Sequence, residues 1–220
     1  MTKAFLSLTL VCCFTSCLAQ KDDSTPFSVN RSSEDSTAVD LDSLDIDFQF
    51  RGQCYAFNSK KHDVQSNGEA HSNNLAQSTD DSFTKNGNYL FLNTSEYSGK
   101  KLATHKLYLV NNTLKKTTYS AQDSRLNIVA QALTENGEWK AISYLPSSWC
   151  GNSYHTLTLG KNEYWSFDVP VFKGSFETKL RYVLLEKGEH RLVSNEIDVR
   201  INPDQFNSEK KQQHTPPVSY

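Results

Sequence analysis

The sequence predicts an all-β protein, a β-sandwich with flexible ends. Three observations support this prediction: short segments rich in β-branched and aromatic residues, turn residues between these segments, and apolar side chains that alternate with polar ones. No stretch repeats its apolar residues with a convincing helical spacing. A chain of 220 residues with 37% hydrophobic residues is long enough for one ordinary domain. We therefore expect two packed antiparallel sheets around one core.

The first residues have the form of a bacterial export signal. Lys3 precedes an apolar run, residues 4–14, that is too short to span a bilayer. Residues 14–17, Phe-Thr-Ser-Cys, resemble the lipobox of bacterial lipoproteins, in which the cysteine is acylated and becomes the new N-terminus. This resemblance implies a signal peptide over residues 1–17, a lipid on Cys17 and a membrane as partner. Ordinary cleavage after Ala19 is the alternative, and both readings place the chain outside the cytoplasm.

The next residues point to the outer membrane and then to a spacer. Residues 18–23, Leu-Ala-Gln-Lys-Asp-Asp, resemble the export signal of surface lipoproteins in the Bacteroidota. This resemblance implies a protein anchored to the outer membrane and exposed on the cell surface, whereas the alternative is that these charges merely open a linker. Residues 18–44 are rich in Ser, Thr and Asp and nearly free of aromatic residues, which predicts a disordered acidic linker.

The domain is expected over residues 45–206. Its first strand is predicted at residues 44–51, where Leu, Ile and two Phe alternate with polar residues. Residues 58–88 are polar and rich in Asn, Ser and Gly, which predicts a long insertion that is unusual inside a compact domain. Residues 207–220 carry charges and a Pro-Pro pair, and we expect a disordered tail there.

Further strands are predicted in chain order, with turn residues between them. They are residues 89–93, 106–111, 125–134, 139–145, 154–159, 163–169, 177–185 and 191–202. Asn136 and Gly137 are typical of a tight hairpin, because both residues tolerate positive φ, and residues 160–162 and 187–189 mark two more turns. Alternation predicts that Leu180, Tyr182 and Leu184, and likewise Ile197, Val199 and Ile201, face the core.

Two resemblances concern the second half of the chain. Residues 178–184 and 193–199 resemble the closing F and G strands of fibronectin type III and related immunoglobulin-like domains. This resemblance implies an immunoglobulin/fibronectin-III-like β-sandwich. Residues 125–206, with Ser-Trp-Cys-Gly-Asn-Ser-Tyr-His at 148–155, resemble exported proteins of unknown function from the same bacterial phylum, which implies no activity.

Two cysteines remain once the signal and the anchor are set aside, Cys54 and Cys150. An exported chain meets an oxidising environment, so the simplest prediction is a disulfide between them. Two separate thiols are the first alternative. The second is a nucleophilic Cys150 with His155 as its base, which would make the protein an envelope hydrolase or a thiol enzyme. Asp168 or Asp198 would then orient the imidazole.

Other functional classes find little support in the sequence. His62, Asp63 and His71 could ligate a divalent ion, but their spacing fits no close-set metal motif, so no metal and no cofactor are predicted. The net charge of −2 gives no basic face for nucleic acid. Neither a phosphate-binding loop nor a nucleophile elbow is present in the sequence, so no catalytic residues are assigned.

The aromatic residues of the second half are the remaining candidates for binding: Trp139, Trp149, Tyr154, Tyr164 and Trp165. Exposed aromatic rings stack on sugars or form protein hot spots, and buried rings fill the core. Trp139 follows a tight turn and is expected in the core. Trp149 and Tyr154 flank a loop of Ser, Gly and Asn.

We therefore expect a candidate ligand patch at Trp149, Asn152, Tyr154 and His155. The function predicted from the sequence is a non-enzymatic binding or accessory module with a protein or glycan partner, held by a lipid in the cell envelope. The alternatives are the thiol enzyme and a purely structural spacer, which would expose no large apolar patch.

Overall fold

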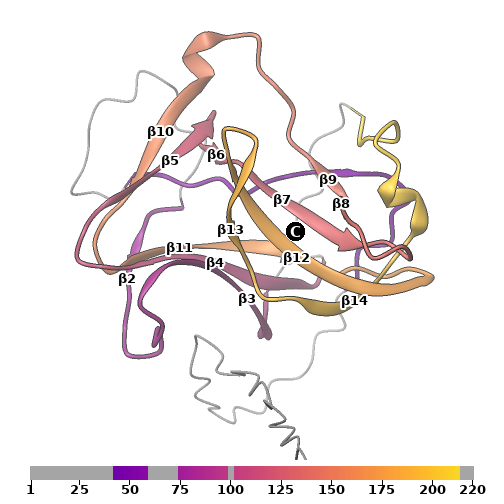
Figure 1. The fold of residues 1–220 in the computed structure, drawn as a ribbon, viewed down its shortest axis with the longest axis horizontal. Helices are drawn as coiled ribbons and strands as arrows, with labels where there is room; N and C mark the ends of the chain where they lie inside the picture. Colours follow the sequence, from indigo (N-terminus) through magenta and orange to yellow (C-terminus); the bar gives the residue numbers. More distant parts are fainter. Residues whose placement is uncertain (1–41, 59–73, 99–101, 214–220) are drawn as a thin grey trace, which may run out of the picture.

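The computed structural model describes residues 42–58, 74–98 and 102–213. These residues form an all-β sandwich, as predicted, whose two layers of strands enclose one large core (Figure 1). Within the described ranges there is no α-helix, and so none that is long and apolar enough to span a membrane. Cys17 and the rest of residues 1–41 lie outside the described residues.

Among the described residues, the strands follow one another in chain order with two short 3-10 helices. They are β1 (Phe50–Arg51), β2 (Gln77–Ser78), β3 (Gly87–Ser98), β4 (Thr104–Asn112), β5 (Thr117–Gln122), β6 (Arg125–Leu126), β7 (Ile128–Leu133), β8 (Trp139–Ala141), β9 (Ser143–Tyr144), β10 (Tyr154–Leu159), β11 (Glu163–Pro170), β12 (Phe176–Glu186), β13 (Glu189–Val193) and β14 (Ile197–Ile201). The 3-10 helices are η2 (Gly151–Ser153) and η3 (Pro203–Phe206).

The first layer has the strand order β2-β11-β4-β3, with all neighbours antiparallel. The other layer contains β13-β12-β7-β8, with β14 also paired to β12, and the smaller sheet β10-β5-β6. The hairpin of β12 and β13 fastens these two sheets together. Its Arg191 donates to the carbonyl of Thr118 at 2.9 Å and pairs with Glu186 at 2.7 Å, while Ser120 of β5 donates to the same carboxylate at 2.7 Å.

At one corner of the sandwich, two neighbouring chain segments pass together from one layer to the other. β4 pairs with β11 and β5 pairs with β10, so the connections at residues 113–116 and 160–162 lie side by side; we call them the corner turns. Asn111, whose side chain is fully buried, donates to the carbonyls of Lys115 (2.8 Å) and Gly160 (2.7 Å). The backbone N–H of Asn162 also donates to the Thr113 carbonyl, at 3.2 Å. The buried carboxamide therefore fastens both turns to one point.

The core contains the residues that alternation places there. Leu180, Tyr182 and Leu184 are all at most 3% exposed, which confirms that β12 presents this face to the other layer. Trp165 is completely buried, and its indole N–H donates to the carbonyl of Phe57 at 2.9 Å. A second cluster, which we call the aromatic cluster, forms on the opposite face of the first layer and consists of Val110 and the rings of Phe83, Tyr89, Phe91 and Tyr108.

The core prediction holds for β14 and is wrong for one tryptophan. Ile201 is buried, and Ile197 and Val199 are partly buried and pack against the core. Trp139, which we expected in the core, is half-buried at the start of β8, and the guanidinium of Arg181 lies 4.0 Å from its ring centroid. A cation over the ring face therefore covers this indole in place of core side chains.

The N-terminal boundary of the domain differs from the prediction. Leu44 is buried and its N–H donates to the carbonyl of Val171 at 2.7 Å, so the last residues of the predicted linker 18–44 belong to the domain. Regular strand geometry is confined to β1 instead of running through residues 44–51. Gln49, which alternation places outward, is buried because its side chain donates to the carbonyl of Ala141 at 2.8 Å.

The described part of the predicted insertion at residues 58–88 is integral to the sandwich. β2 pairs with β11, and the carboxamide of Asn74 donates to the carbonyls of Tyr55 (3.1 Å) and Ser166 (2.9 Å). Phe83 lies in the aromatic cluster, 4.7 Å from Tyr164 between ring centroids. Residues 59–73, which include His62, Asp63 and His71, lie outside the described residues.

The prediction of a disordered tail from residue 207 is wrong for residues 207–213. Gln49 donates its N–H to the carbonyl of Lys210 (2.8 Å), and Gln212 donates its own to the carbonyl of Gln49 (2.9 Å). Tyr144 adds a bond from its hydroxyl to the carbonyl of Gln212 at 2.8 Å. The tail thus lies alongside the N-terminal segment, and the domain reaches at least to residue 213.

Candidate ligand-binding loop

The loop between β9 and β10 is the most exposed apolar feature of the described residues. It projects from the top of the molecule in Figure 1 and comprises residues 145–154, which we call the aromatic loop. The side chain of Trp149 is 104% exposed and that of Tyr154 is 53% exposed. Large aromatic side chains normally bury most of their surface, so an indole left wholly in solvent is an exception.

Hydrogen bonds within the aromatic loop fix its shape. The hydroxyls of Ser148 and Ser153 lie 2.8 Å apart, and the Ser148 hydroxyl accepts the N–H of Cys150 at 3.2 Å. Tyr154 donates its hydroxyl to the Ser148 carbonyl and accepts the Ser148 N–H, both at 3.2 Å. η2 closes the loop with a bond from the Ser153 N–H to the Cys150 carbonyl at 3.1 Å. Trp149 therefore projects from a tied loop.

The base of the aromatic loop rests on the turn between β5 and β6. Asp123 and Ser124 both have positive φ, 49° and 64°, and the N–H of Asp123 donates to the carbonyl of Ser153 at 2.8 Å. Arg125, which follows, is 1% exposed and donates to the carbonyl of Pro146 at 2.8 Å. Burial lowers the pKa of this guanidinium. A buried cation is costly, and here it holds one end of the loop.

The exposed surface of the aromatic loop is neutral. Residues 145–154 contain no Asp, Glu, Lys or Arg, and Ser147, Cys150, Gly151 and Asn152 are exposed beside the two rings. Tyr, Ser, Gly, Asn and Trp are the residues that dominate antibody paratopes, where rigid rings supply contact area and small polar residues supply hydrogen bonds. The composition suits a polar neutral ligand such as a glycan or a protein surface.

Three of the four predicted patch residues share this surface. Trp149, Asn152 and Tyr154 are exposed on the aromatic loop or at its end. His155 is half-buried at the start of β10, and its Nδ1 lies 3.1 Å from the Ser153 carbonyl. His155 therefore contacts the loop backbone from the side.

The predicted disulfide between Cys54 and Cys150 does not form, and both thiols are free. Cys54 is 5% exposed within the core, and burial raises the pKa of its thiol to about 12. Cys150 is exposed on the aromatic loop. The disulfide prediction failed because one sulfur lies inside the sandwich and the other on a projecting loop.

The residues considered for catalysis are engaged separately. Asp168 of β11 forms an ion pair with Lys106 at 2.8 Å, and Asp198 of β14 pairs with Lys179 at 3.2 Å. Neither aspartate contacts His155 in the interactions that the structure describes. Among the described residues, no three His, Cys, Asp or Glu side chains lie close enough to hold a metal ion.

One hollow was not predicted from the sequence. A groove of about 970 Å³ opens between β14 and the segment that follows β11, and Ile197, Val199, Phe172 and Phe176 line it. Alternation assigns Ile197 and Val199 to the core, and the sequence pattern does not indicate that they also line a groove.

Comparison with protein-family models, curated proteins and solved structures gives no match. The interpretation of the aromatic loop therefore depends on its own geometry.

Proposed function

We propose that this protein is a non-enzymatic binding module that recognises a protein or glycan partner through the aromatic loop. The observation that supports the proposal is the complete exposure of Trp149 on a loop fixed by its own hydrogen bonds. A ring presented in a fixed position loses little conformational entropy when it binds, so more of the contact energy remains as affinity.

The proposal includes a lipid on Cys17 and a position on the outer membrane facing outward. Its support is the sequence of residues 1–23, which resembles the export and lipidation signals of bacterial surface lipoproteins. Two acyl chains anchor a protein stably where one does not. The domain would then stand on the linker that precedes residue 42 and offer the aromatic loop to partners outside the cell.

A matched pair of variants tests the binding proposal. The protein is purified with its lipid from its own membranes and assayed on envelope glycans and by photocrosslinking on intact cells. Trp149→Ala should lower affinity for the partner about 30-fold or more, as truncation of a hot spot does. Val193→Ala, which trims another exposed apolar side chain, should leave affinity unchanged. Equal binding by both variants would refute the role of the loop.

The anchor has its own test. The intact mass of the mature protein should begin at Cys17 and include a diacylglyceryl group. A mature N-terminus at any other residue would contradict lipidation while leaving the binding proposal intact.

The exposed thiol of Cys150 keeps a thiol enzyme as the second candidate. Its weakness is that no described hydrogen bond joins the Cys150 thiol to His155, whose Nδ1 faces the Ser153 carbonyl. If Cys150→Ser leaves partner binding unchanged and no thioester or ester substrate is turned over by the unmodified protein, this alternative falls.

A further inference from the structure

The corner turns carry a second exposed apolar side chain, in a different chemical setting from the aromatic loop. Leu114 is 83% exposed, and the side chains of Lys115, Lys116 and Lys161 are exposed around it. Residues 113–116 and 160–162 contain no Asp or Glu, although the whole chain has a net charge of −2. The three lysines therefore make the surface beside this exposed leucine positively charged, although the whole chain is slightly acidic.

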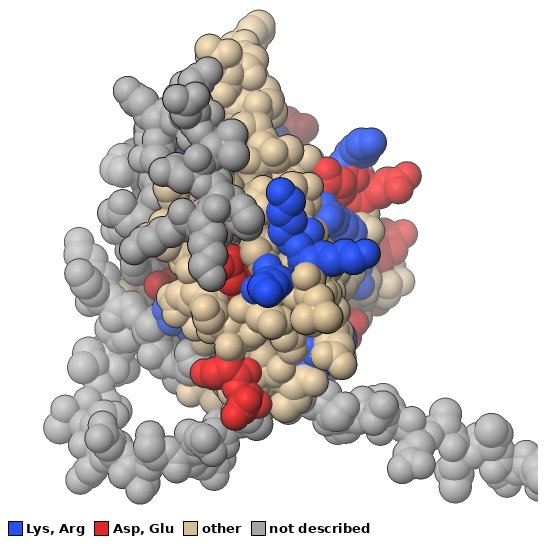
Figure 2. Space-filling model, turned by 90° about the vertical axis from the view of Figure 1, so that its left-hand side faces the viewer, with Lys and Arg blue, Asp and Glu red and all other residues tan. Residues whose placement is uncertain are grey.

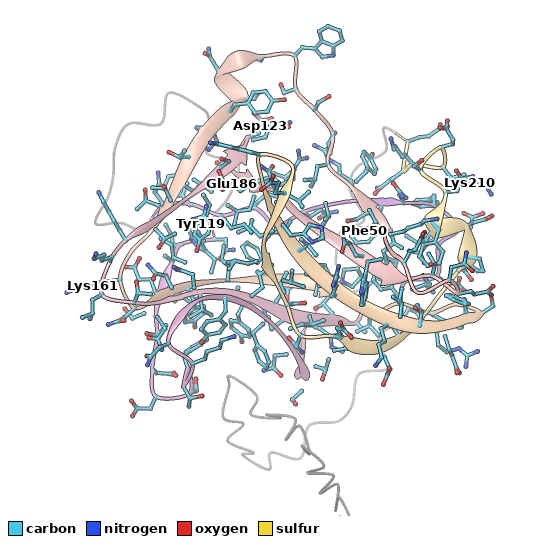
Figure 3. All side chains as sticks on the ribbon, viewed as in Figure 1. Phe50, Tyr119, Asp123, Lys161, Glu186 and Lys210 are labelled. Carbon is cyan, nitrogen blue, oxygen red and sulfur yellow. The ribbon has the colours of Figure 1, made fainter. Side chains whose placement is uncertain are left out.

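Figure 2 shows this end of the molecule, where Lys and Arg side chains gather at the centre with neutral side chains between them. Lys161 marks the same end, at the left of Figure 3. The Asp and Glu side chains visible in Figure 2 lie mainly at the lower edge and at the right, and one lies directly beside the central Lys and Arg side chains. The nearest carboxylate in sequence, that of Glu163, accepts the N–H of Gly160 at 2.7 Å and so is engaged by the turn.

The corner turns are also held in place. The buried side chain of Asn111 donates to both turns. The hydroxyl of Thr113 accepts the N–H of Lys115 at 3.2 Å and donates to the Lys115 carbonyl at 2.9 Å. The N–H of Asn162 bonds the Thr113 carbonyl at 3.2 Å. The backbone that carries Leu114 and the lysines is therefore fixed before any partner binds.

We propose that the corner turns dock on an anionic lipid surface. Leu114 inserts at the boundary between head groups and acyl chains, and the ammonium groups of the lysines contact lipid phosphates. Lysine stems pack along apolar surface while their charged ends reach the head groups, which is the arrangement that interfacial segments use. An acidic protein partner would be matched by the charges but would give no reason for an exposed leucine among them.

This docking is compatible with the aromatic loop acting elsewhere. The corner turns lie at the left of Figure 1 and the aromatic loop at its top, so a membrane at the first leaves the second accessible. The inference depends on charge and exposure alone and holds whether or not Cys17 carries a lipid.

The test is binding of the full chain to phosphatidylcholine vesicles with and without phosphatidylglycerol. Replacing Lys115, Lys116 and Lys161 together by Gln should weaken binding to the anionic vesicles on the order of 100-fold, since each lysine near an anionic surface contributes about fivefold. Leu114→Ser should also weaken binding to the anionic vesicles.

The control variant changes Lys140, Lys173 and Lys179 to Gln, which removes the same charge from other surfaces, and should weaken binding less than about tenfold. All chains share the same N-terminal residues, so differences report the replaced side chains.

Hydrogen exchange of the unmodified chain locates the contact directly. Anionic vesicles should slow exchange at residues 113–117 and 160–163 and leave residues 147–153 unchanged. Protection of the aromatic loop in place of the corner turns would overturn the proposal. So would protection of the corner turns by polyglutamate but not by vesicles, because that outcome assigns the patch to an acidic protein. Equal vesicle binding by the triple variant and its control would overturn it as well.

Discussion

The carboxamide of Asn111 donates to the carbonyl of Gly160 at 2.7 Å, and this bond joins two turns that are far apart in the chain. The same nitrogen bonds the carbonyl of Lys115 at 2.8 Å, and the side chain is completely buried. This buried amide thus fastens both corner turns to β4, and its removal would leave the buried Gly160 carbonyl without this donor.

We predict that Asn111→Asp lowers the free energy of unfolding by about 2–4 kcal/mol, because a carboxylate cannot donate to these carbonyls and would be buried. Urea unfolding at neutral pH measures this loss. Asn136→Asp makes the same chemical change on an exposed hairpin turn and should stay within about 0.5 kcal/mol of the unmodified protein. A small effect at residue 111 would show that the corner does not depend on the amide.

Truncation of Trp165 should destabilise the fold strongly, whereas truncation of Trp149 should hardly affect it. Trp165→Ala removes a wholly buried indole and its bond to Phe57, and we expect a loss of about 3–5 kcal/mol in unfolding free energy. Trp149→Ala should change stability by less than about 0.5 kcal/mol, because the indole contacts solvent. Acrylamide quenching of tryptophan fluorescence should decrease in Trp149→Ala and should not decrease in Trp165→Ala. The reverse pattern would contradict the exposure of the aromatic loop.

The two thiols should differ in reactivity. In the folded protein at neutral pH, iodoacetamide should alkylate Cys150 rapidly and leave Cys54 intact until the chain unfolds, since only the first sulfur is accessible. Peptide mass spectrometry separates the two sites. Detection of a Cys54–Cys150 linked peptide in protein from its native membrane would contradict the free thiols of the structure.

Cys54 should also make the protein sensitive to alkali. The pKa of its thiol is about 12 in the folded chain against 9.0 for the ordinary thiol, so above pH 9 the unfolded chain loses a proton that the folded chain keeps. The stabilisation is therefore complete below pH 9 and declines, by up to about 1.4 kcal/mol per pH unit, as the pH rises toward 12. Cys54→Ala should remove this slope between pH 9 and pH 10.

The control for the alkaline prediction is Cys150→Ala, which should keep the slope. Above pH 10 two tyrosines add to the decline, because burial raises the pKa values of Tyr89 and Tyr119 to about 12 from 10.0. The informative range for the cysteine is therefore below pH 10. An unchanged slope in Cys54→Ala would show that the thiol does not cause the effect.

Local signals predicted much of the fold. The strand expected at residues 154–159 is β10, and Asn136-Gly137 forms the expected turn with Gly137 at φ 79°. These features depend on neighbouring residues, so a single sequence can reveal them. β5 was missed, because Thr117–Gln122 is largely polar and is recognisable as a strand only through its pairing with β10.

Long-range features escaped prediction for a related reason. The polar residues of the tail predict disorder, yet Gln212 is held by Gln49 near the start of the domain and by Tyr144 in its middle. The Ser and Gly neighbours of Trp149 made its exposure and its burial about equally plausible. The position of Cys54 in the core could not, because cysteine counting gives the number of sulfurs and not the distance between them.

The pairing of β1 with β9 has a mechanical consequence. These strands are parallel, with Phe50 opposite Ser143, and β9 runs directly into the aromatic loop. A tether that pulls on the chain before residue 42 and a partner that pulls on Trp149 would draw the two strands in opposite directions along their length. Their bonds would then carry the load together, in shear, instead of opening one after another.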